Sequence, residues 1–166
     1  RHVLDELTTR GAHVRAIVRS PQKLSKECRA RPNLELVEAS LLEMSKAEFE
    51  QQVRSCDAVV SCLGHVMNLR GVFGQPRDLV TQAVTRIVEA ARTAEATSPK
   101  RLVVMSSVSV NRPDHVEPRR GSIERAVLTL VRCLVPPAKD NQAVADFLLE
   151  SVGTSDPHIE WVVVRP

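Results

Sequence analysis

The hydrophobic positions of this chain fall into short aliphatic runs separated by longer segments of mixed character. The runs are rich in valine, leucine and isoleucine and are bounded by charged or turn-forming residues, a pattern that predicts β-strands. Because most of them show no polar alternation, they are typical of strands buried on both faces of a parallel sheet. The five predicted strands are Val14–Val18, Leu34–Glu38, Ala58–Cys62, Arg101–Met105 and Glu160–Val164.

Helical patterns fill the segments between these runs. The chain opens in a predicted helix over Arg1–Gly11, and Ser45 with Glu48 forms a capping-box pattern that opens a second helix over Lys46–Arg54. After Pro76, apolar residues at helical spacing predict a long amphipathic helix, on the positions Leu79, Ala83, Ile87, Val88 and Ala91.

A last helix is expected from about Asn141 to Val152, with Gly153 in the C-cap position. This alternation of strand and helix predicts right-handed crossovers and a doubly wound parallel sheet, a three-layer αβα architecture within one α/β domain over residues 1–166.

The chain begins in a helix, and neither a strand nor a glycine-rich turn precedes that helix. In a doubly wound sheet of order 3-2-1-4-5-6, the first strand is central. Because the chain also stops directly after a strand, we expect a domain truncated at both ends. The isolated chain is then expected to be poorly stable, with apolar strand edges exposed.

The segment Asn111–Asp140 departs from the strand-helix rhythm. A polar half that contains proline precedes an apolar, helix-like half with the sequence SIERAVLTLVRCLVPP. Two interpretations stay open: a helix packed on the sheet edge, or a wall over a substrate pocket, since the segment follows a strand end where such sheets bind ligands.

Composition narrows the classes of function. Of the 166 residues, 43% are hydrophobic, which suits the core of one globular domain, and the formal net charge of +3 is spread along the chain. We therefore expect no nucleic-acid partner. No apolar run approaches the roughly 20 residues that span a bilayer, so no membrane partner is expected either.

Cysteine spacing and the absence of tyrosine exclude further chemistry. The four cysteines form no CxxC pair and have no histidine at zinc-ligand spacing; they are Cys28, Cys56, Cys62 and Cys133. We expect reduced thiols, no metal site and a cytoplasmic location. The sequence has no tyrosine, so no mechanism that needs a phenol acid can operate.

The end of the first predicted strand carries the most informative charges. In a dinucleotide-binding α/β fold, a carboxylate at the end of the second strand favours NAD, whereas an arginine accommodates the extra phosphate of NADP. Here Arg19 ends the run, Ser20 follows, and Lys23 adds a positive charge one turn later. Because no carboxylate stands at this strand end, we expect NADP(H) to be preferred over NAD(H), although a merely solvated Arg19 has the same spacing.

Several motifs follow one another at suitable spacing along nearly the whole chain. They are Arg19 after VRAIV, CLG at Cys62–Gly64, VVMSS at Val103–Ser107, DN at Asp140–Asn141 and WVVVRP at Trp161–Pro166. With these motifs the chain resembles the atypical short-chain dehydrogenase/reductase group of NAD(P)H-binding, NmrA-like proteins. The resemblance implies a Rossmann fold that binds NADP(H), with a GxxGxxG turn just before Arg1.

The resemblance also implies cofactor-binding residues after two strands. Ser40 and Leu41 would line the adenine, although the aspartate usual at this point is absent. Cys62, Leu63 and Gly64 would face the cofactor ribose, where a glycine lets the backbone approach closely.

Two serines end the fourth visible strand. Ser107 matches the serine that hydrogen-bonds a substrate carbonyl in short-chain reductases and is the candidate catalytic residue, while Ser106 is assigned to the cofactor. A simpler interpretation of Ser107 is a hydroxyl that caps the strand end. His65 is interpreted as a satisfied loop histidine, with a catalytic role as the less favoured alternative.

The Tyr-x-x-x-Lys pair of the standard reductase mechanism is replaced. Aligned on the DN pair, the tyrosine position falls near Gln142 and the lysine position near Asp146, and Lys139 is a weak substitute for the lysine. Reduction by a tyrosine acid is therefore excluded.

Two classes of function remain. The first is an NADPH-dependent oxidoreductase that acts on a small carbonyl or conjugated substrate, which takes its proton from water or through Ser107. The second is a non-catalytic NADP(H)-sensing or regulatory module. A flavodoxin-like or receiver domain is a poorer alternative, because the acidic cluster or FMN loop of those folds is absent and Arg19 would have no role. Oligomeric state stays open.

Overall fold

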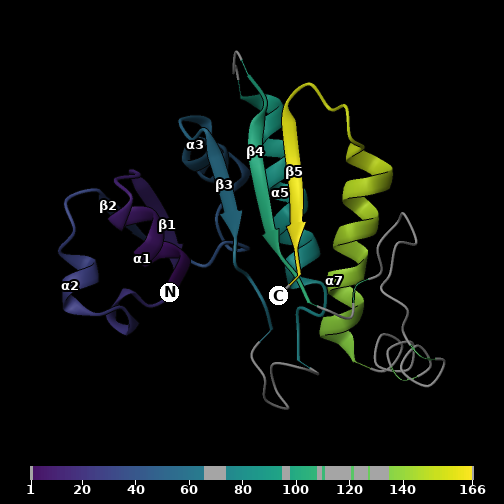
Figure 1. The fold of residues 1–166 in the computed structure, drawn as a ribbon, viewed down its shortest axis with the longest axis horizontal. Coiled ribbons are helices and arrows are strands. Elements are labelled where there is room, and N and C mark those ends of the chain that lie inside the picture. The colour runs from purple at the N-terminus through teal and green to yellow at the C-terminus, as the bar shows by residue number, and fades with distance from the viewer. Residues whose placement is uncertain are drawn as a thin grey trace. The chain divides into compact units, whose positions relative to one another are not determined.

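The computed structural model describes residues 2–65, 74–94, 98–107, 110, 121, 127 and 135–165 (Figure 1). Their contacts divide the chain into two compact units, Arg1–Gln52 and Val53–Pro166, which we call the N-terminal and C-terminal units. Most of the segment for which the sequence left two interpretations, a packed helix or a pocket wall, lies outside the described residues.

The N-terminal unit carries a two-stranded parallel sheet. Its elements are α1 (His2–Thr9), β1 (Val14–Val18), the short 3-10 turn η1 (Pro21–Lys23), α2 (Lys26–Arg29) and β2 (Leu34–Glu38), and α3 (Lys46–Arg54) begins in it. The strands β1 and β2 pair in register from Val14 opposite Leu34 to Val18 opposite Glu38. Both strands have the bounds predicted from the aliphatic runs.

Polar side chains join α1 to the turn before β2. The amide of Asn33 donates from Nδ2 to the carbonyls of Thr8 (2.9 Å) and Ala12 (2.8 Å). Arg31 donates to the carbonyl of Asp5 (3.1 Å) and to the Thr8 hydroxyl, and it pairs with the Asp5 carboxylate at 3.2 Å. These contacts tie the turn before β2 to α1 and to the residues that directly follow this helix.

The predicted capping box opens α3. The backbone N–H of Ser45 donates to Glu48 Oε2 (2.8 Å), and the N–H of Glu48 donates back to Ser45 Oγ (3.3 Å). The hydrogen bond from the Ser45 hydroxyl, followed by that from its backbone N–H, lowers the pKa of Glu48 below its usual value. The helix therefore begins where the sequence predicts.

The C-terminal unit carries a three-stranded parallel sheet in the order β3-β4-β5. Its elements are β3 (Ala58–Ser61), α5 (Leu79–Thr93), β4 (Lys100–Met105), α7 (Pro136–Phe147), the π-helical turn η2 (Leu148–Val152) and β5 (Ile159–Val164). Figure 1 shows the carboxyl ends of the strands and the first turns of α5 and α7 at the same end of this unit. The strand bounds differ from the prediction by one residue at one end of each strand.

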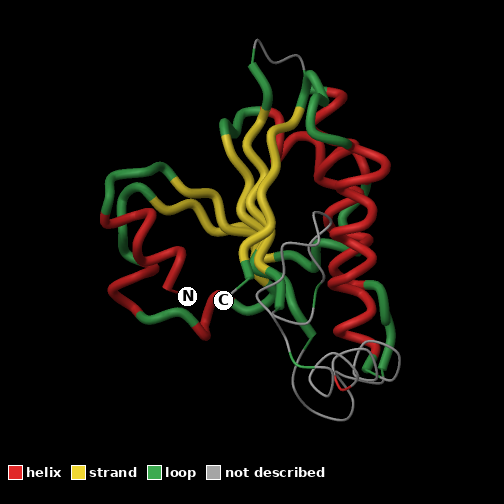
Figure 2. Tube along the Cα trace, turned by 45° about the vertical axis from the view of Figure 1, so that its right-hand side comes forward, coloured by secondary structure: helices red, strands yellow, loops and turns green. Residues whose placement is uncertain are grey.

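The core of the C-terminal unit lies between the sheet and its two long helices, which pack against each other on one face (Figure 2). Its largest fully buried side chains are Leu102, Leu148, Val80, Val84, Val88, Val104, Val110 and Val144. On β5, by contrast, Val162 is 50% exposed and Val164 is 38% exposed. The expectation of strands buried on both faces is therefore wrong for β5, because the described helices cover only one face of the sheet.

The helix α7 begins five residues earlier than predicted. It starts at Pro136, and two prolines occupy its first positions, where their fixed φ suits a helix and no N–H is required. At its other end the N–H of Gly153 donates to the carbonyl of Leu148 (2.9 Å), and Gly153 has φ +73°, a value that favours glycine. The predicted stop at Gly153 is confirmed.

Among the described residues, the strands form two separate sheets, β1 with β2 and β3 with β4 and β5. Within each sheet all pairs are parallel, as the strand-helix alternation predicts.

Candidate functional site

A basic turn follows β1 in the N-terminal unit. Arg19 comes directly after the strand and is exposed, and Lys23, also exposed, ends η1. The N–H of Lys23 donates to the carbonyl of half-buried Ser20 (3.1 Å), which makes the turn tight. Within residues 2–65, the side chains of Arg19 and Lys23 make no ion pair, so both positive charges are available to a ligand.

The turn after β2 starts beside this basic turn. The N–H of Ala39 donates to the carbonyl of Val18 (3.1 Å), which keeps the ends of the two strands together. The Ser40 carbonyl then accepts from the N–H groups of Glu43 (2.9 Å) and Met44 (3.2 Å). Ser40 and Leu41 are half-buried. The N-terminal unit thus brings together the residues assigned to the adenosine phosphate and to the adenine.

The loop after β3 carries the residues assigned to the cofactor ribose. Cys62 and Gly64 are exposed and Leu63 is half-buried. A Cβ placed on Gly64 would meet no atom within 4 Å, and its φ is not positive. Nothing within the described chain therefore requires a glycine here, and any need for one would come from a bound ligand.

Buried hydroxyls stand at the carboxyl ends of β3 and β4. The Oγ atoms of Ser61 and Ser106 are buried and have no hydrogen-bond partner among the described residues. Ser61 pairs in register with Val104, so Ser61 and Ser106 lie on the sheet face that the helices cover. Buried hydroxyls normally have partners, so this end of the sheet suits a ligand rich in hydroxyl and phosphate groups.

The candidate catalytic residue Ser107 lies in a turn after β4. Its carbonyl accepts from the N–H of Val110 (3.2 Å), and the Val110 carbonyl accepts from Arg165 Nη1 (2.5 Å), the residue after β5. Ser107 is half-buried. The turn that follows β4 is therefore also bound by the residue that follows β5.

His65 forms a buried hydrogen bond to a residue that the sequence did not connect with it. Its Nε2 lies 2.8 Å from Oδ2 of Asp140, a residue of α7, and the two side chains are 5% and 0% exposed. The interpretation of His65 as a satisfied loop histidine is confirmed. Its partner could not be recognised, because 75 positions separate the two residues and Asp140 stood out only as part of the DN motif.

Gln142 and Asp146, the positions that the resemblance gives to the tyrosine and lysine, lie on one side of α7. Gln142 Nε2 donates to Asp146 Oδ1 at 2.7 Å, so these two side chains bind each other. Lys139 is exposed on the first turns of the same helix.

No group of three or more histidine, cysteine, aspartate or glutamate side chains among the described residues could hold a metal ion. No described helix is both long and apolar enough to cross a membrane.

Solved structures with the same fold include several nucleotide-binding proteins. SP1627, a candidate NADH-flavin reductase of Streptococcus pneumoniae TIGR4, is 18% identical with a TM-score of 0.57, over 99% of this chain and 64% of that chain. The Bordetella bronchiseptica enzyme WbmH, in complex with NAD+, is 21% identical with a TM-score of 0.63, over 99% and 51%. The UDP-glucose 4-epimerase of Thermus thermophilus, in complex with NAD, is 16% identical with a TM-score of 0.65, over 99% and 50%.

These similarities show the fold, a fragment of a Rossmann-type domain, and the chain spans less than two thirds of the length of each of these proteins. The comparison with curated proteins gave no match. A family model described as NAD(P)H-binding matches residues 1–166. The chain therefore belongs to the NAD(P)H-binding family of Rossmann-type proteins.

Proposed function

We propose that this chain is the nucleotide-binding part of an oxidoreductase that uses NADP(H) in preference to NAD(H) and reduces a small carbonyl or conjugated substrate. The observation that carries the nucleotide preference is the basic turn after β1. Arg19 and Lys23 are exposed there, and neither is neutralised by a carboxylate among residues 2–65. A guanidinium and an ammonium group within one turn suit a phosphate monoester, which carries more charge than a ribose hydroxyl.

The bound nucleotide would supply the hydride, and the chain would position both reactants. Ser107 is the group proposed to hold the substrate carbonyl, and the contacts of Val110 and Arg165 keep its turn in place. The proton would come from water or through the Ser107 hydroxyl, because the chain contains no tyrosine.

One observation favours a second candidate, a module that binds NADP(H) without turnover. Gln142 and Asp146 hydrogen-bond to each other on α7, at the positions that the resemblance gives to the tyrosine and lysine. An amide and a carboxylate that are mutually satisfied supply neither an acid nor a cation for the ribose. Such a module would bind the nucleotide through the same basic turn.

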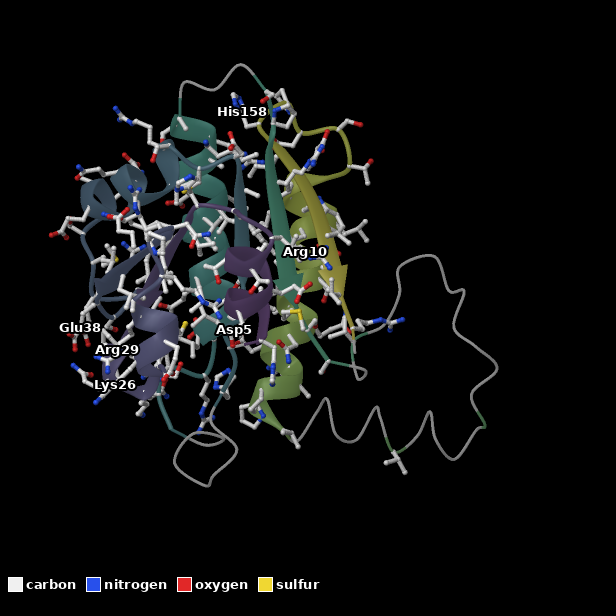
Figure 3. The ribbon with its side chains drawn as sticks, turned by 60° about the vertical axis from the view of Figure 1, so that its left-hand side comes forward. Asp5, Arg10, Lys26, Arg29, Glu38 and His158 are labelled. Carbon is white, nitrogen blue, oxygen red and sulfur yellow. The ribbon has the colours of Figure 1, made fainter. Side chains whose placement is uncertain are left out.

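Titration of the full-length protein with NADPH and with NADH tests the nucleotide preference. Arg19→Ala should raise the Kd for NADPH about tenfold, since a hydrogen bond to a charged group contributes roughly 1.5–3 kcal/mol, and should leave the Kd for NADH unchanged. Arg29→Ala is the matched control, because Arg29 is exposed on α2 and its side chain points away from the ribbon (Figure 3). Tighter binding of NADH than of NADPH by the unchanged protein would refute the preference.

Turnover separates the two candidates. NADPH consumption is measured with quinones, flavins and enals as acceptors, in the unchanged protein and in Ser107→Ala. The oxidoreductase proposal predicts turnover that Ser107→Ala reduces at least about tenfold without changing the Kd for NADPH. Tight NADPH binding without consumption across the acceptors would favour the sensing module.

A further inference from the structure

The carboxylate of Asp140 caps a helix to which it does not belong. The N–H of Val80 donates to Asp140 Oδ2 (2.8 Å) and the N–H of Thr81 donates to Oδ1 (3.0 Å), both from the first turn of α5. The Thr81 hydroxyl donates to Oδ1 at 2.6 Å, and His65 Nε2 lies 2.8 Å from Oδ2. Asp78, the N-cap residue of α5, makes no such cap with its own side chain.

This arrangement explains how a carboxylate can be fully buried. Four donors surround its two oxygens, and the N-terminus of a helix favours negative charge. A buried charge without such partners would be strongly destabilising. Because an ionised carboxylate only accepts hydrogen bonds, the His65 ring must donate through Nε2–H. The first turn of α5 is therefore already filled by a carboxylate of the chain.

The His65 ring links this cap to the loop after β3. Cys62, Leu63 and Gly64 separate the ring from the last residue of the strand. Cys62 and Gly64 are exposed, whereas the His65 side chain is only 5% exposed. The loop is thus anchored at one end by β3 and at the other by a ring bound to Asp140 of α7, and its exposed part lies between the two anchors.

We propose that His65 is a positioning residue for the nucleotide: through its hydrogen bond to Asp140, it holds the Cys62–Gly64 loop in the conformation that receives the cofactor. This inference rests on the proposed nucleotide-binding function and extends it to a residue that need not touch the ligand. The buried hydroxyl of Ser61, directly before the loop, has no hydrogen-bond partner among the described residues, which independently indicates that this end of β3 receives a polar group.

Two amide substitutions at His65 test the hydrogen bond to Asp140 separately from any acid-base role of the imidazole ring. His65→Gln places its amide nitrogen near the position of Nε2, whereas His65→Asn places it near Nδ1 and falls short of Asp140. In the full-length protein, His65→Asn should weaken NADPH binding about tenfold, and His65→Gln should keep it within about threefold of the unchanged protein. Titration by NADPH fluorescence measures both constants.

Lys100→Met is the matched control for a general loss of stability. Lys100 is 6% exposed at the amino end of β4, and its Nζ donates to the carbonyls of Arg54 (3.0 Å) and Cys56 (2.6 Å). This variant breaks buried hydrogen bonds at the opposite end of the same sheet. It should lower the melting temperature without changing the Kd for NADPH.

The positioning role is overturned if His65→Asn binds NADPH as tightly as the unchanged protein, if His65→Gln is as weak as His65→Asn, or if Lys100→Met weakens binding equally. Normal binding by both amide variants with lost turnover would instead assign the ring a chemical role. If the unchanged protein binds neither NADPH nor NADH, the proposed function itself fails, a result distinct from any difference between the variants.

Discussion

The two units of this chain are stabilised in different ways, although both are built from parallel strands and helices. In the C-terminal unit, α5 alone buries seven residues, and Leu102 and Val104 of β4 are 2% and 1% exposed. In the N-terminal unit, all residues of β1 are only half-buried, and the buried hydrophobic residues are Cys28 and Phe49. Hydrogen bonds from Arg31 and Asn33, in the turn before β2, connect this strand to α1 and to Ala12.

The difference indicates how each unit responds to change. Burial of apolar surface is not directional, so a core tolerates small shifts but loses much free energy when a large side chain is truncated. Hydrogen bonds are directional, and a donor that is removed leaves a carbonyl unpaired. The C-terminal unit should therefore be most sensitive to changes of volume, and the N-terminal unit to changes of polar groups.

The largest expected effect is the truncation of a core residue in the C-terminal unit. Leu148→Ala removes a side chain that is 0% exposed and should lower the free energy of unfolding by about 3–5 kcal/mol. Leu36→Ala, the matched change on half-buried β2, should cost roughly 1 kcal/mol. Denaturant unfolding followed by circular dichroism measures both, and equal losses would contradict the comparison.

A smaller effect is expected from a polar change in the N-terminal unit. Asn33→Ala removes the amide donor to the carbonyls of Ala12 and Thr8, of which Thr8 keeps the N–H of Gly11, and should cost about 1–2 kcal/mol. Asn33→Asp should cost more, because a carboxylate then faces two carbonyl oxygens. Amide exchange should accelerate in α1 and β1 and stay unchanged in α5. Gln22→Ala, an exposed change in the same unit, is the control, and unchanged exchange in Asn33→Ala would disprove the role of these bonds.

The smallest effect concerns an ion pair at the far end of the C-terminal unit. Burial raises the pKa of Asp156, but the hydrogen bonds from Arg92 and from the N–H of His158, with the positive charges of these residues, outweigh burial and lower it. Arg92 Nη2 lies 2.7 Å from Asp156 Oδ2, and the Arg92 side chain is 40% exposed, so solvent screens the pair. We expect a contribution of roughly 1 kcal/mol or less.

The sign of the pH dependence follows from the lowered pKa. The stabilisation by Asp156 is present above the pKa of the unfolded chain, about 3.9, and is lost as the pH falls through the lower value in the folded state. Asp156→Asn should therefore reduce stability near neutral pH and make the acid limb of the stability profile shallower. An acid limb that is equally steep in this variant would show that other carboxylates dominate it.

The sequence predicted the strands and the capped helices because these depend on neighbouring residues. The run at Val14–Val18 and the pair Ser45 and Glu48 carry their signal within a few positions. The start of α7 at Pro136 was missed because prolines are found both after the end of a helix and in its first turn. The sequence does not show which of these two positions a proline pair occupies. The exposure of Val162 was missed because a continuous apolar run does not reveal which faces are covered.

For the candidate site, the sequence by itself determined which chemistry is available: an arginine and a lysine after β1, serines after β4 and no tyrosine anywhere. These are properties of residue type and short spacing. Only the tertiary structure decided which polar groups meet. It placed Asp140 at the N-terminus of α5 and the His65 ring against it, because parallel strands bring loops distant in sequence to one edge of a sheet, and hydrogen bonds depend on that proximity rather than on order along the chain.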